Sequence, residues 1–167
     1  MHVALVPAMA DQQPILANLI QLYVHDFSEH TPVTLGVDGR FAYPQLPLYW
    51  SEAGRFPLLA VTDQSWAGFI LVRQESQPTH ADSVFDMAEF FVLRAFRRKG
   101  IGTRLAHLAF ERFPGNWQVR VMESNSAACQ FWQQAIENFT GASQLPRRMR
   151  IDGMGWYTFR FVSGAER

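Results

Sequence analysis

The sequence contains a single cysteine, Cys129, among its 167 residues. One thiol cannot form a disulfide within the chain and supplies only one ligand of a zinc site, so we expect neither feature, and a reducing cytoplasm is the expected location. The chain also lacks an excess of charge, because 15 Lys and Arg residues balance 15 Asp and Glu residues. This balance argues against general binding of nucleic acids or acidic membranes, which requires a basic surplus.

Long apolar segments are missing as well. Apolar runs such as Phe-Ile-Leu-Val at 69–72 are much shorter than the roughly 20 residues that span a bilayer. The N-terminal stretch has no basic region, and Pro7 and Asp11 interrupt its apolar residues, so no signal peptide is expected. The five histidines include no pair at the spacing of metal ligands on one helical face, so we expect no metal site.

The sequence does have enough apolar residues for a full core. Hydrophobic residues make up 48% of the chain, and its length suits one domain that spans 1–167. Periodicity and turn residues predict a mixed α/β order. The predicted strands are 2–6, 56–62, 66–73, 83–93, 117–123, 148–151 and 156–162, with a turn at 63–65. The predicted helices are a first one from the N-cap Asp11 to Phe27, then 100–113 and 125–139, with a loop and a short helix within 31–56.

Two glycines stand where the second long helix should begin, in the segment FRRKGIGTRL at 96–105. Glycine costs about 1 kcal/mol relative to alanine inside a helix, so another requirement must favour it here. The first backbone N–H groups of a helix lack internal partners and carry the positive end of the helix dipole. We expect Gly100 and Gly102 to remove Cβ atoms that would keep an anion away from these groups, while the basic run 97–99 adds positive charge.

The spacing of this segment separates it from two familiar phosphate motifs. Position 105 is Leu, so the dinucleotide motif G-x-G-x-x-G is incomplete, and no Gly-Lys-Ser/Thr ending of a P-loop is present. The pattern Arg97-x-x-Gly100-x-Gly102 instead resembles the pyrophosphate-binding loop of the GNAT N-acetyltransferase superfamily. The other interpretation of this short pattern is a strand–helix connection with a basic surface.

A second motif and the order of the elements support the resemblance. The family follows this loop with a strand and then a helix that bears Asn-x-x-Ala-x-x-x-aromatic, and Asn125, Ala128 and Trp132 occupy those positions. The segments RRKGIG and NSAACQFWQQAI are similar to those of a bacterial subgroup of predicted acetyltransferases. The resemblance implies a single-domain GNAT-like α/β fold. Its mixed, twisted sheet of about six to seven strands would be flanked by helices and splayed between strands four (83–93) and five (117–123).

The resemblance further implies transfer of an acetyl group from acetyl-CoA to a primary amine. The pantetheine arm would lie in the splayed gap and bond to the backbone of strand four, where one N–H group would polarise the thioester carbonyl. The amides of residues 98–103 would hold the pyrophosphate. The residues that the resemblance assigns to acetyl-CoA are Phe91, Val92, Leu93, Arg97, Arg98, Lys99, Gly100, Ile101, Gly102, Thr103, Asn125, Ala128 and Trp132.

Glu89 is the candidate general base. An amine must lose a proton before it attacks a thioester, because an alkyl ammonium has a pKa of about 10.4. Glu89 lies in the otherwise apolar segment MAEFFVL at 87–93, and strand alternation places it on the side of Phe91 and Leu93. These surroundings predict a raised pKa or a satisfied partner. The alternative is a structural carboxylate that pairs with an arginine or faces solvent.

Trp132 departs from the family pattern. Many members have a tyrosine at this position, whose hydroxyl is taken to protonate the leaving thiolate, whereas the indole N–H does not transfer protons. Trp132 also completes an apolar stripe along its helix, which favours a place in the core. Protonation would then come from water or from another group such as one of the four tyrosines, or it is not needed. Asn125 likewise has a second interpretation, as the N-cap of its helix.

The first helix and the aromatic loop are the expected acceptor-binding parts. The candidate acceptor residues are Tyr23, Asp26, Tyr43 and Trp50, because an aromatic wall with a carboxylate suits a cationic amine. Two other functions remain open from the sequence: a non-catalytic acyl-CoA-binding module and an interaction protein that reuses the fold. The expected partners are acetyl-CoA and an amine, bound by a monomer or homodimer, with no nucleic acid and no membrane.

Overall fold

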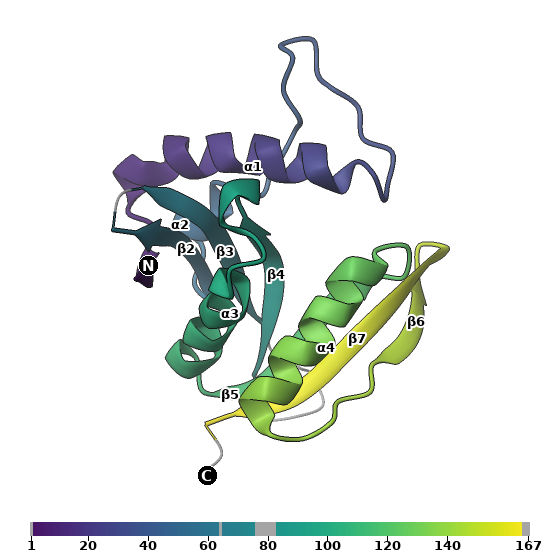
Figure 1. Cartoon of the computed structure of the whole chain (residues 1–167). Helices are drawn as coiled ribbons and strands as arrows, with labels where there is room; N and C mark the ends of the chain where they lie inside the picture. Colours follow the sequence, from purple (N-terminus) through teal and green to yellow (C-terminus); the bar gives the residue numbers. More distant parts are fainter. Residues whose placement is uncertain (1, 64, 76–82, 165–167) are drawn as a thin grey trace.

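Seven strands form one mixed sheet in the order β1-β2-β3-β4-β5-β7-β6 (Figure 1). The computed structural model describes residues 2–63, 65–75 and 83–164. β4 and β5 pair in parallel, and all other neighbouring strands of this sheet pair antiparallel, which confirms the predicted mixed α/β class. The strands are β1 (Val3–Pro7), β2 (Arg55–Thr62), β3 (Trp66–Glu75), β4 (Val84–Val92), β5 (Gly115–Met122), β6 (Arg147–Ile151) and β7 (Met154–Ser163).

Helices cover both faces of the sheet. Residues 67–72 of β3 are all buried, although alternate side chains of a strand point to opposite faces. Leu16 and Ile20 of α1 pack in the core on one face, and Leu105 of α3 and Ile136 of α4 pack in the core on the other. The helices are α1 (Gln13–Phe27), α2 (Leu48–Ser51), α3 (Ile101–Arg112) and α4 (Ser126–Thr140), with 3₁₀ turns η1 (Ala10–Gln12) and η2 (Arg94–Phe96).

The predicted elements all occur, and most of their ends differ from the observed ones by one or two residues. The predicted N-cap at Asp11 is wrong, because the chain first turns through η1 and Asp11 lies inside that turn. Gln12 is the N-cap of α1 but makes no side-chain capping hydrogen bond there; its Oε1 accepts a hydrogen bond from the Met9 N–H at 2.9 Å, at the start of η1. The hairpin of β2 and β3 is present, but Gln64 of its predicted turn lies outside the described residues.

β4 and β5 separate soon after they begin. Only residues 84–86 of β4 pair with residues 116–118 of β5, and beyond this point β4 stays beside β3 while β5 stays beside β7. The register of β3 and β4 shifts at Ala88, which is a bulge that increases the local twist. The predicted splay between strands four and five is therefore confirmed, and Figure 1 shows β4 and the β5–β7 pair running apart.

The segment 28–47 forms the predicted loop and leads into the short helix α2. It projects beyond α1 before it returns to the sheet (Figure 1). Gln21 of α1 fixes the returning chain, because its side chain accepts a hydrogen bond from the Phe41 N–H at 2.8 Å and donates one to the Phe41 carbonyl at 3.0 Å. This anchor brings Tyr43, two residues later, to the mouth of the gap.

Candidate active site

The loop before α3 presents backbone N–H groups beside the gap. Its N-cap, Gly100, has a φ of +74°, and Arg98 has a φ of +57°. The first helical hydrogen bond runs from the Arg104 N–H to the Gly100 carbonyl at 3.0 Å, so the N–H groups of residues 101–103 have no partner within the helix. N–H groups next to residues in the left-handed conformation form an anion-binding concavity, and the helix dipole adds positive potential.

The two glycines of this loop have different structural reasons. A Cβ at Gly100 would meet no atom within 4 Å, but its φ of +74° is strained for any residue that has a Cβ. A Cβ at Gly102 would lie 3.2 Å from Cε2 of Phe131 and 3.9 Å from Cγ2 of Val92. Each glycine therefore has a structural reason of its own, in addition to the expected role of leaving room for an anion. Backbone conformation explains Gly100, and close packing of α3 against Phe131 explains Gly102.

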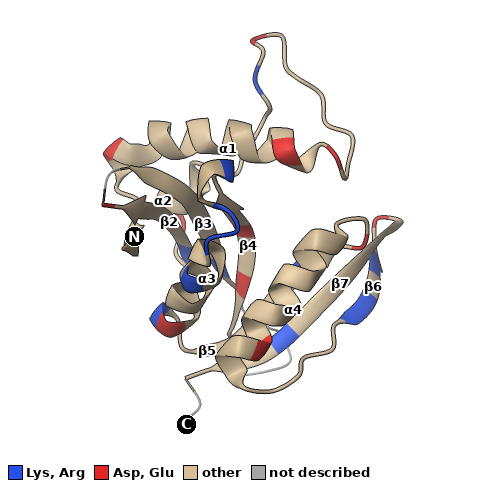
Figure 2. Ribbon diagram, in the orientation of Figure 1, with Lys and Arg blue, Asp and Glu red and all other residues tan. Residues whose placement is uncertain are grey.

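Two arginines beside this loop hold Asp26 of α1. Arg94 and Arg97 each donate a hydrogen bond of 2.6 Å to its carboxylate. Partial burial raises the pKa of Asp26, but the hydrogen bonds and charges of Arg94 and Arg97 outweigh it and hold the pKa below its usual value. The negative charge of Asp26 is therefore paired with two arginines of the same chain, and Asp26 does not present a free carboxylate to a cationic acceptor. Figure 2 shows the basic loop as a blue segment just before α3.

A cavity of about 550 Å³ opens beside this loop, between α1, the end of β4 and the first turns of α4. Among the residues that the resemblance assigns to acetyl-CoA, its walls include Phe91, Val92, Arg97, Arg98, Gly100, Gly102, Thr103, Asn125, Ala128 and Trp132. Leu93, Lys99 and Ile101 do not line it. The Lys99 ammonium donates to the Ala95 carbonyl at 2.8 Å, and Ile101 is buried in the core.

The end of β4 turns the Val92 N–H toward the gap. The Leu93 N–H donates to the Ala67 carbonyl at 2.8 Å and is therefore bonded toward β3. Alternate residues of an antiparallel ladder bond to the same neighbour, so the Phe91 N–H also points toward β3 and the Val92 N–H points away from it. The Val92 carbonyl accepts a hydrogen bond from Nε of Arg97 at 2.7 Å. The Val92 N–H is thus the donor at this level, where β5 has already departed.

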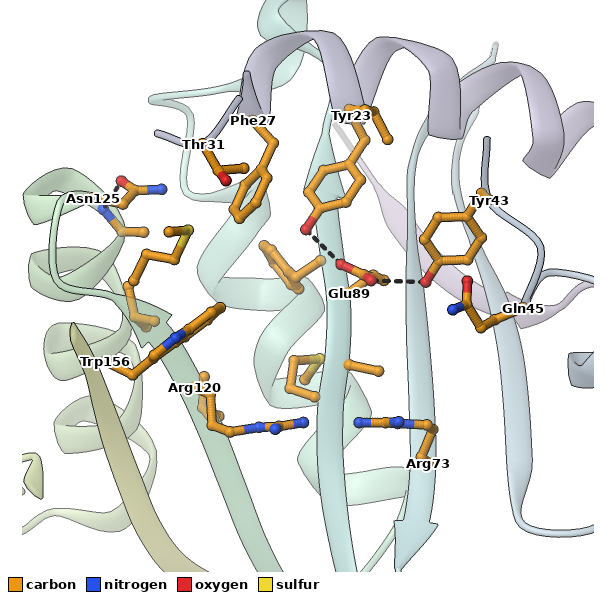
Figure 3. Close-up of a pocket in the computed structure, with 18 of the residues that line it drawn as sticks. Tyr23, Phe27, Thr31, Tyr43, Gln45, Arg73, Glu89, Arg120, Asn125 and Trp156 are labelled. Atoms are coloured by element: carbon orange, nitrogen blue, oxygen red, sulfur yellow. Dashed lines mark hydrogen bonds between the residues drawn. The ribbon is translucent and has the colours of Figure 1, made fainter. Parts of the chain in front are cut away.

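Glu89 of β4 lies between two tyrosines (Figure 3). Its Oε2 accepts a hydrogen bond from the Tyr23 hydroxyl at 2.5 Å, and its Oε1 accepts one from the Tyr43 hydroxyl at 2.7 Å. Burial raises the pKa of Glu89 above its ordinary value, although the two hydrogen bonds and the charge of Arg73 partly oppose this effect. Glu89 faces α1 on the side of Phe91, as strand alternation predicted, and it has both a raised pKa and satisfied oxygens.

The tyrosines around Glu89 are neutral hydrogen-bond donors. Burial, followed by the charge of Glu89, raises the pKa of both Tyr23 and Tyr43 well above the ordinary value. Burial also raises the pKa of Tyr49 of α2, on the same wall, to about 12. A phenol with such a pKa keeps its proton at neutral pH. Tyr23 and Tyr43 therefore orient the carboxylate without exchanging protons with it.

Trp132 and Asn125 form the α4 side of the gap. Both line the cavity beside the loop and also a second cavity, which contains Glu89. Trp132 is only 6% exposed and packs edge-on against Phe90, with ring centroids 4.8 Å apart. This burial confirms the core position that the apolar stripe predicted. Asn125 is the N-cap of α4, as predicted, because its Oδ1 accepts a hydrogen bond from the Ala128 N–H at 3.0 Å.

A charged cluster that sequence reasoning missed lies next to Glu89. A second cavity of about 590 Å³ is lined by Glu89, by Arg73 of β3 and by Arg120 of β5 (Figure 3). Both arginines bind the fully buried Asp86, through Nη2 of Arg73 at 2.6 Å and Nη2 of Arg120 at 2.8 Å. The only signal in the sequence is a charged residue within each of three apolar strands, and the strand register is needed to bring them together.

The remaining acceptor candidates lie in two different places. Tyr23 and Tyr43 line the cavity that contains Glu89, but their hydroxyls are bonded to it. Trp50 lines neither cavity. Its indole N–H donates to the Ala8 carbonyl at 2.9 Å, and its ring packs against the core beneath α1.

None of the helices in the described part of the chain has the length and apolar character needed to cross a bilayer. Within residues 2–63, 65–75 and 83–164, no three His, Cys, Asp or Glu side chains come together as a metal site.

Residues 16–136 match the family model described as the acetyltransferase (GNAT) family. The match covers more than half of the chain and includes β4, the loop before α3 and most of α4. The chain therefore belongs to the GNAT acetyltransferase family, which uses acetyl-CoA, and the resemblance drawn from the two motifs is confirmed. A comparison with curated proteins found no match.

Solved structures of acetyltransferases share the fold over nearly the whole chain. An aminoglycoside N(6')acetyltransferase from Legionella pneumophila has a TM-score of 0.68 at 11% identity and covers 97% of this chain and 94% of its own. A spermidine N-acetyltransferase from Vibrio cholerae, in complex with CoA and spermine, has a TM-score of 0.63 at 13% identity. The alignment covers 96% of this chain and 95% of that protein. A GNAT acetyltransferase from Streptococcus pneumoniae has a TM-score of 0.61 at 18% identity and covers 98% and 100%. Identities this low establish a common fold only.

Proposed function

We propose that this chain is an N-acetyltransferase that moves an acetyl group from acetyl-CoA to a primary amine by direct attack within one complex. The observation that carries the proposal is Glu89, a half-buried carboxylate with a raised pKa in the same gap as the loop before α3. A carboxylate with perturbed pKa in a cleft is a typical general base. The family membership supplies the acyl donor, and the gap supplies space for both substrates.

The donor is expected along the open edge of β4. The N–H groups of residues 101–103 suit the pyrophosphate oxygens, and the exposed side chains of Arg98 and Lys99 add positive charge. The Val92 N–H suits the thioester carbonyl as an oxyanion donor. Asn125 is close enough to this edge to contact the pantetheine, since it lines both cavities. Leu93 contributes no N–H donor, because Ala67 already accepts from it.

The proton chemistry falls to Glu89. Bound acetyl-CoA supplies an activated acyl carbonyl, and the protein must supply a neutral amine. Glu89 accepts the amine proton, directly or through one water, because each carboxylate oxygen keeps a free lone pair beside its tyrosine hydrogen bond. Its raised pKa makes it a stronger base than an exposed carboxylate, and general bases of this kind contribute about 10²–10⁴-fold to a rate.

The leaving thiolate needs no tyrosine in this proposal. A thiol has a pKa near 8.5 by analogy with cysteine, so water can protonate it at neutral pH. Trp132 has no ionisable proton of this kind and is buried against Phe90. Positioning of the two substrates then supplies much of the remaining rate.

Two measurements test the proposal. Calorimetry with acetyl-CoA is expected to give a defined affinity, and a thiol-release assay is expected to respond to added primary amine. Binding without release for any amine would contradict catalysis and favour a non-catalytic acyl-CoA-binding module. Absence of binding would favour an interaction protein that reuses the fold.

A further inference from the structure

The cavity that contains Glu89 also presents positive charge. Arg73 and Arg120 enter it from either side of β4 (Figure 3). Each side chain is 32% exposed, whereas their common counter-ion, Asp86, is 0% exposed and does not line the cavity. A molecule in this cavity therefore meets the guanidinium groups and does not meet the carboxylate beneath them.

Hydrogen-bond donors remain after Asp86 is satisfied. Asp86 accepts from Nη2 of Arg73 and from Nε and Nη2 of Arg120. Glu75 approaches the same Nη2 of Arg73 at 3.3 Å. Nε of Arg73 is buried without a hydrogen-bond partner among the described residues, and so is the indole Nε1 of Trp156, which lines the same cavity. Buried N–H groups without partners are rare, and these two belong to residues that line the same cavity.

We propose that the acceptor amine carries an anionic group, and that Arg73, Arg120 and Trp156 bind this group while Glu89 receives the amine proton. The inference rests on the proposed N-acetyltransferase function and adds the class of substrate to it. The cavity then has a carboxylate at one end and guanidinium donors at the other, which match the two ends of an amino acid. Paired guanidinium donors are the usual partners of carboxylate and phosphate groups.

The strand register sets the spacing between the two ends. Glu89 pairs with Leu71 of β3, and Arg73 lies two residues further along β3. Two residues along a strand cover roughly 6.6 Å, so the amine and the anion should be separated by only a few bonds. Apolar side chains such as Phe27, Met87 and Val119 line the space around them. A polyamine, by contrast, would place a second ammonium group against the arginines.

The first test uses the unmodified protein. Thiol release from acetyl-CoA is measured with β-alanine and 2-aminoethylphosphonate, and with propylamine, β-alaninamide and spermidine as neutral or polycationic counterparts. L-Alanine and 4-aminobutyrate, each with its amide, vary the distance between the amine and the anion. We expect kcat/KM for the anionic amines to exceed that of their neutral counterparts by at least about tenfold, because the site's buried donors would otherwise stay unpaired. The ratio of β-alanine to the phosphonate identifies the preferred anion.

The outcomes separate the two proposals. If propylamine, the amides or spermidine react as well as the anionic amines, the inference is overturned and the N-acetyltransferase function stands. If no amine releases thiol, the proposed function fails and takes the inference with it.

Variants of Arg120 then test whether this arginine binds the anionic group of the acceptor. Arg120→Gln should lower kcat/KM for β-alanine by at least about tenfold more than it lowers kcat/KM for β-alaninamide. Arg120→Lys keeps a cation beside Asp86 and should retain part of the preference, so it covers the case in which Arg120→Gln does not fold. Arg112→Gln, in the exposed last turn of α3, is the matched control and should change neither rate. Equal losses for the acid and the amide in Arg120→Lys and Arg120→Gln would overturn the role of Arg120 in binding.

Discussion

The hydroxyl of Tyr23 donates a 2.5 Å hydrogen bond to Glu89 and so joins α1 to β4 across 66 positions of the chain. Tyr43 donates to the other carboxylate oxygen from the loop after α1. These hydrogen bonds favour the ionised carboxylate, whereas burial favours its protonated form and has the larger effect on its pKa. In the proposed reaction, Tyr23 is thus a positioning residue that acts through Glu89.

Replacement of Tyr23 by Phe should move the pH profile. The variant loses a hydrogen bond that lowers the pKa of Glu89, so this pKa should rise further. A base works only when deprotonated, and the acid limb of kcat/KM should therefore shift to higher pH. The shift is measured against Tyr157→Phe of β7, which lines neither cavity. An unmoved limb in Tyr23→Phe would limit Tyr23 to a structural role.

Glu89→Gln should remove the base while keeping the size of the side chain. We expect kcat/KM to fall by about 10²–10⁴-fold and the limb that belongs to Glu89 to disappear. KM for acetyl-CoA should change little, since the side chain does not hold the donor. The amine's own ionisation also gives an acid limb, so one acceptor must be used for both proteins. Near-normal turnover would assign proton acceptance to water.

Melting curves give a second check on Glu89 that does not depend on activity. A carboxyl whose pKa is raised in the folded state contributes stability below its unfolded pKa, near 4.5, and loses it as pH rises through the raised value. Glu89→Gln carries no such loss. Its melting temperature relative to the unmodified protein should therefore increase from acidic to neutral pH, and the exposed Glu111→Gln of α3 should show no such trend.

Trp132→Phe should cost stability and spare the reaction. The indole is buried against Phe90 and Phe110, so a smaller ring leaves part of this space unfilled. A loss of about 1–3 kcal/mol is expected, which corresponds to roughly 2–12 °C in Tm for a chain of this size. A large loss of turnover with an unchanged Tm would indicate that the indole takes part in the chemistry.

Sequence patterns correctly predicted the features that are set by residues close together in the chain, such as which side of a helix or strand is buried. The apolar stripe of α4 predicted the burial of Trp132, because helical periodicity fixes which residues share a face. Strand alternation predicted the side on which Glu89 lies, despite the bulge at Ala88. The loop before α3 was identified by spacing, although Gly102 is explained by Phe131, a contact that no spacing reveals.

The ion-pair partners of the buried and half-buried carboxylates could not be predicted from the sequence, because they lie far away along the chain. Asp86 is satisfied by Arg73 and Arg120, which lie 13 and 34 positions away, and only strand register brings the three together. Asp26 was expected at the acceptor, yet it is bound by arginines 68 and 71 positions away. Charge type and alternation are local properties, whereas the partner of a charge is a property of the tertiary fold.

Gly102→Asp should weaken the binding of acetyl-CoA. A Cβ there would press on Phe131, and the carboxylate would repel an anion near the N–H groups of residues 101–103. The affinity should fall by more than tenfold, or about 1.4 kcal/mol, as measured by calorimetry. Gly102→Ala makes the same contact without the charge and should lose less. Gly39→Asp strains its turn, where φ is +72°, but lies away from the cavity beside the loop and should keep the affinity. Unchanged affinity in folded Gly102→Asp would refute the assignment of this loop to the pyrophosphate.

Asp26→Asn should loosen the contact between α1 and the loop before α3. Arg94 and Arg97 are 71% and 40% exposed, so solvent screens both ion pairs and the loss of stability at neutral pH should stay below about 1 kcal/mol. The pKa of Asp26 is lowered from 3.8 in the folded protein, so its contribution is present above 3.8 and is lost as pH falls through the folded value.

The difference in melting temperature between Asp26→Asn and the unmodified protein should consequently be largest near neutral pH, shrink in high salt and vanish in strong acid. Asp11→Asn, exposed in η1, provides the matched control. Arg97 also binds the Val92 carbonyl beside the proposed thioester site. Loss of the ion pair between Arg97 and Asp26 should therefore raise KM for acetyl-CoA, while kcat changes less. A melting difference that stays constant with pH and salt would mean that Asp26 acts through packing and not through its charge.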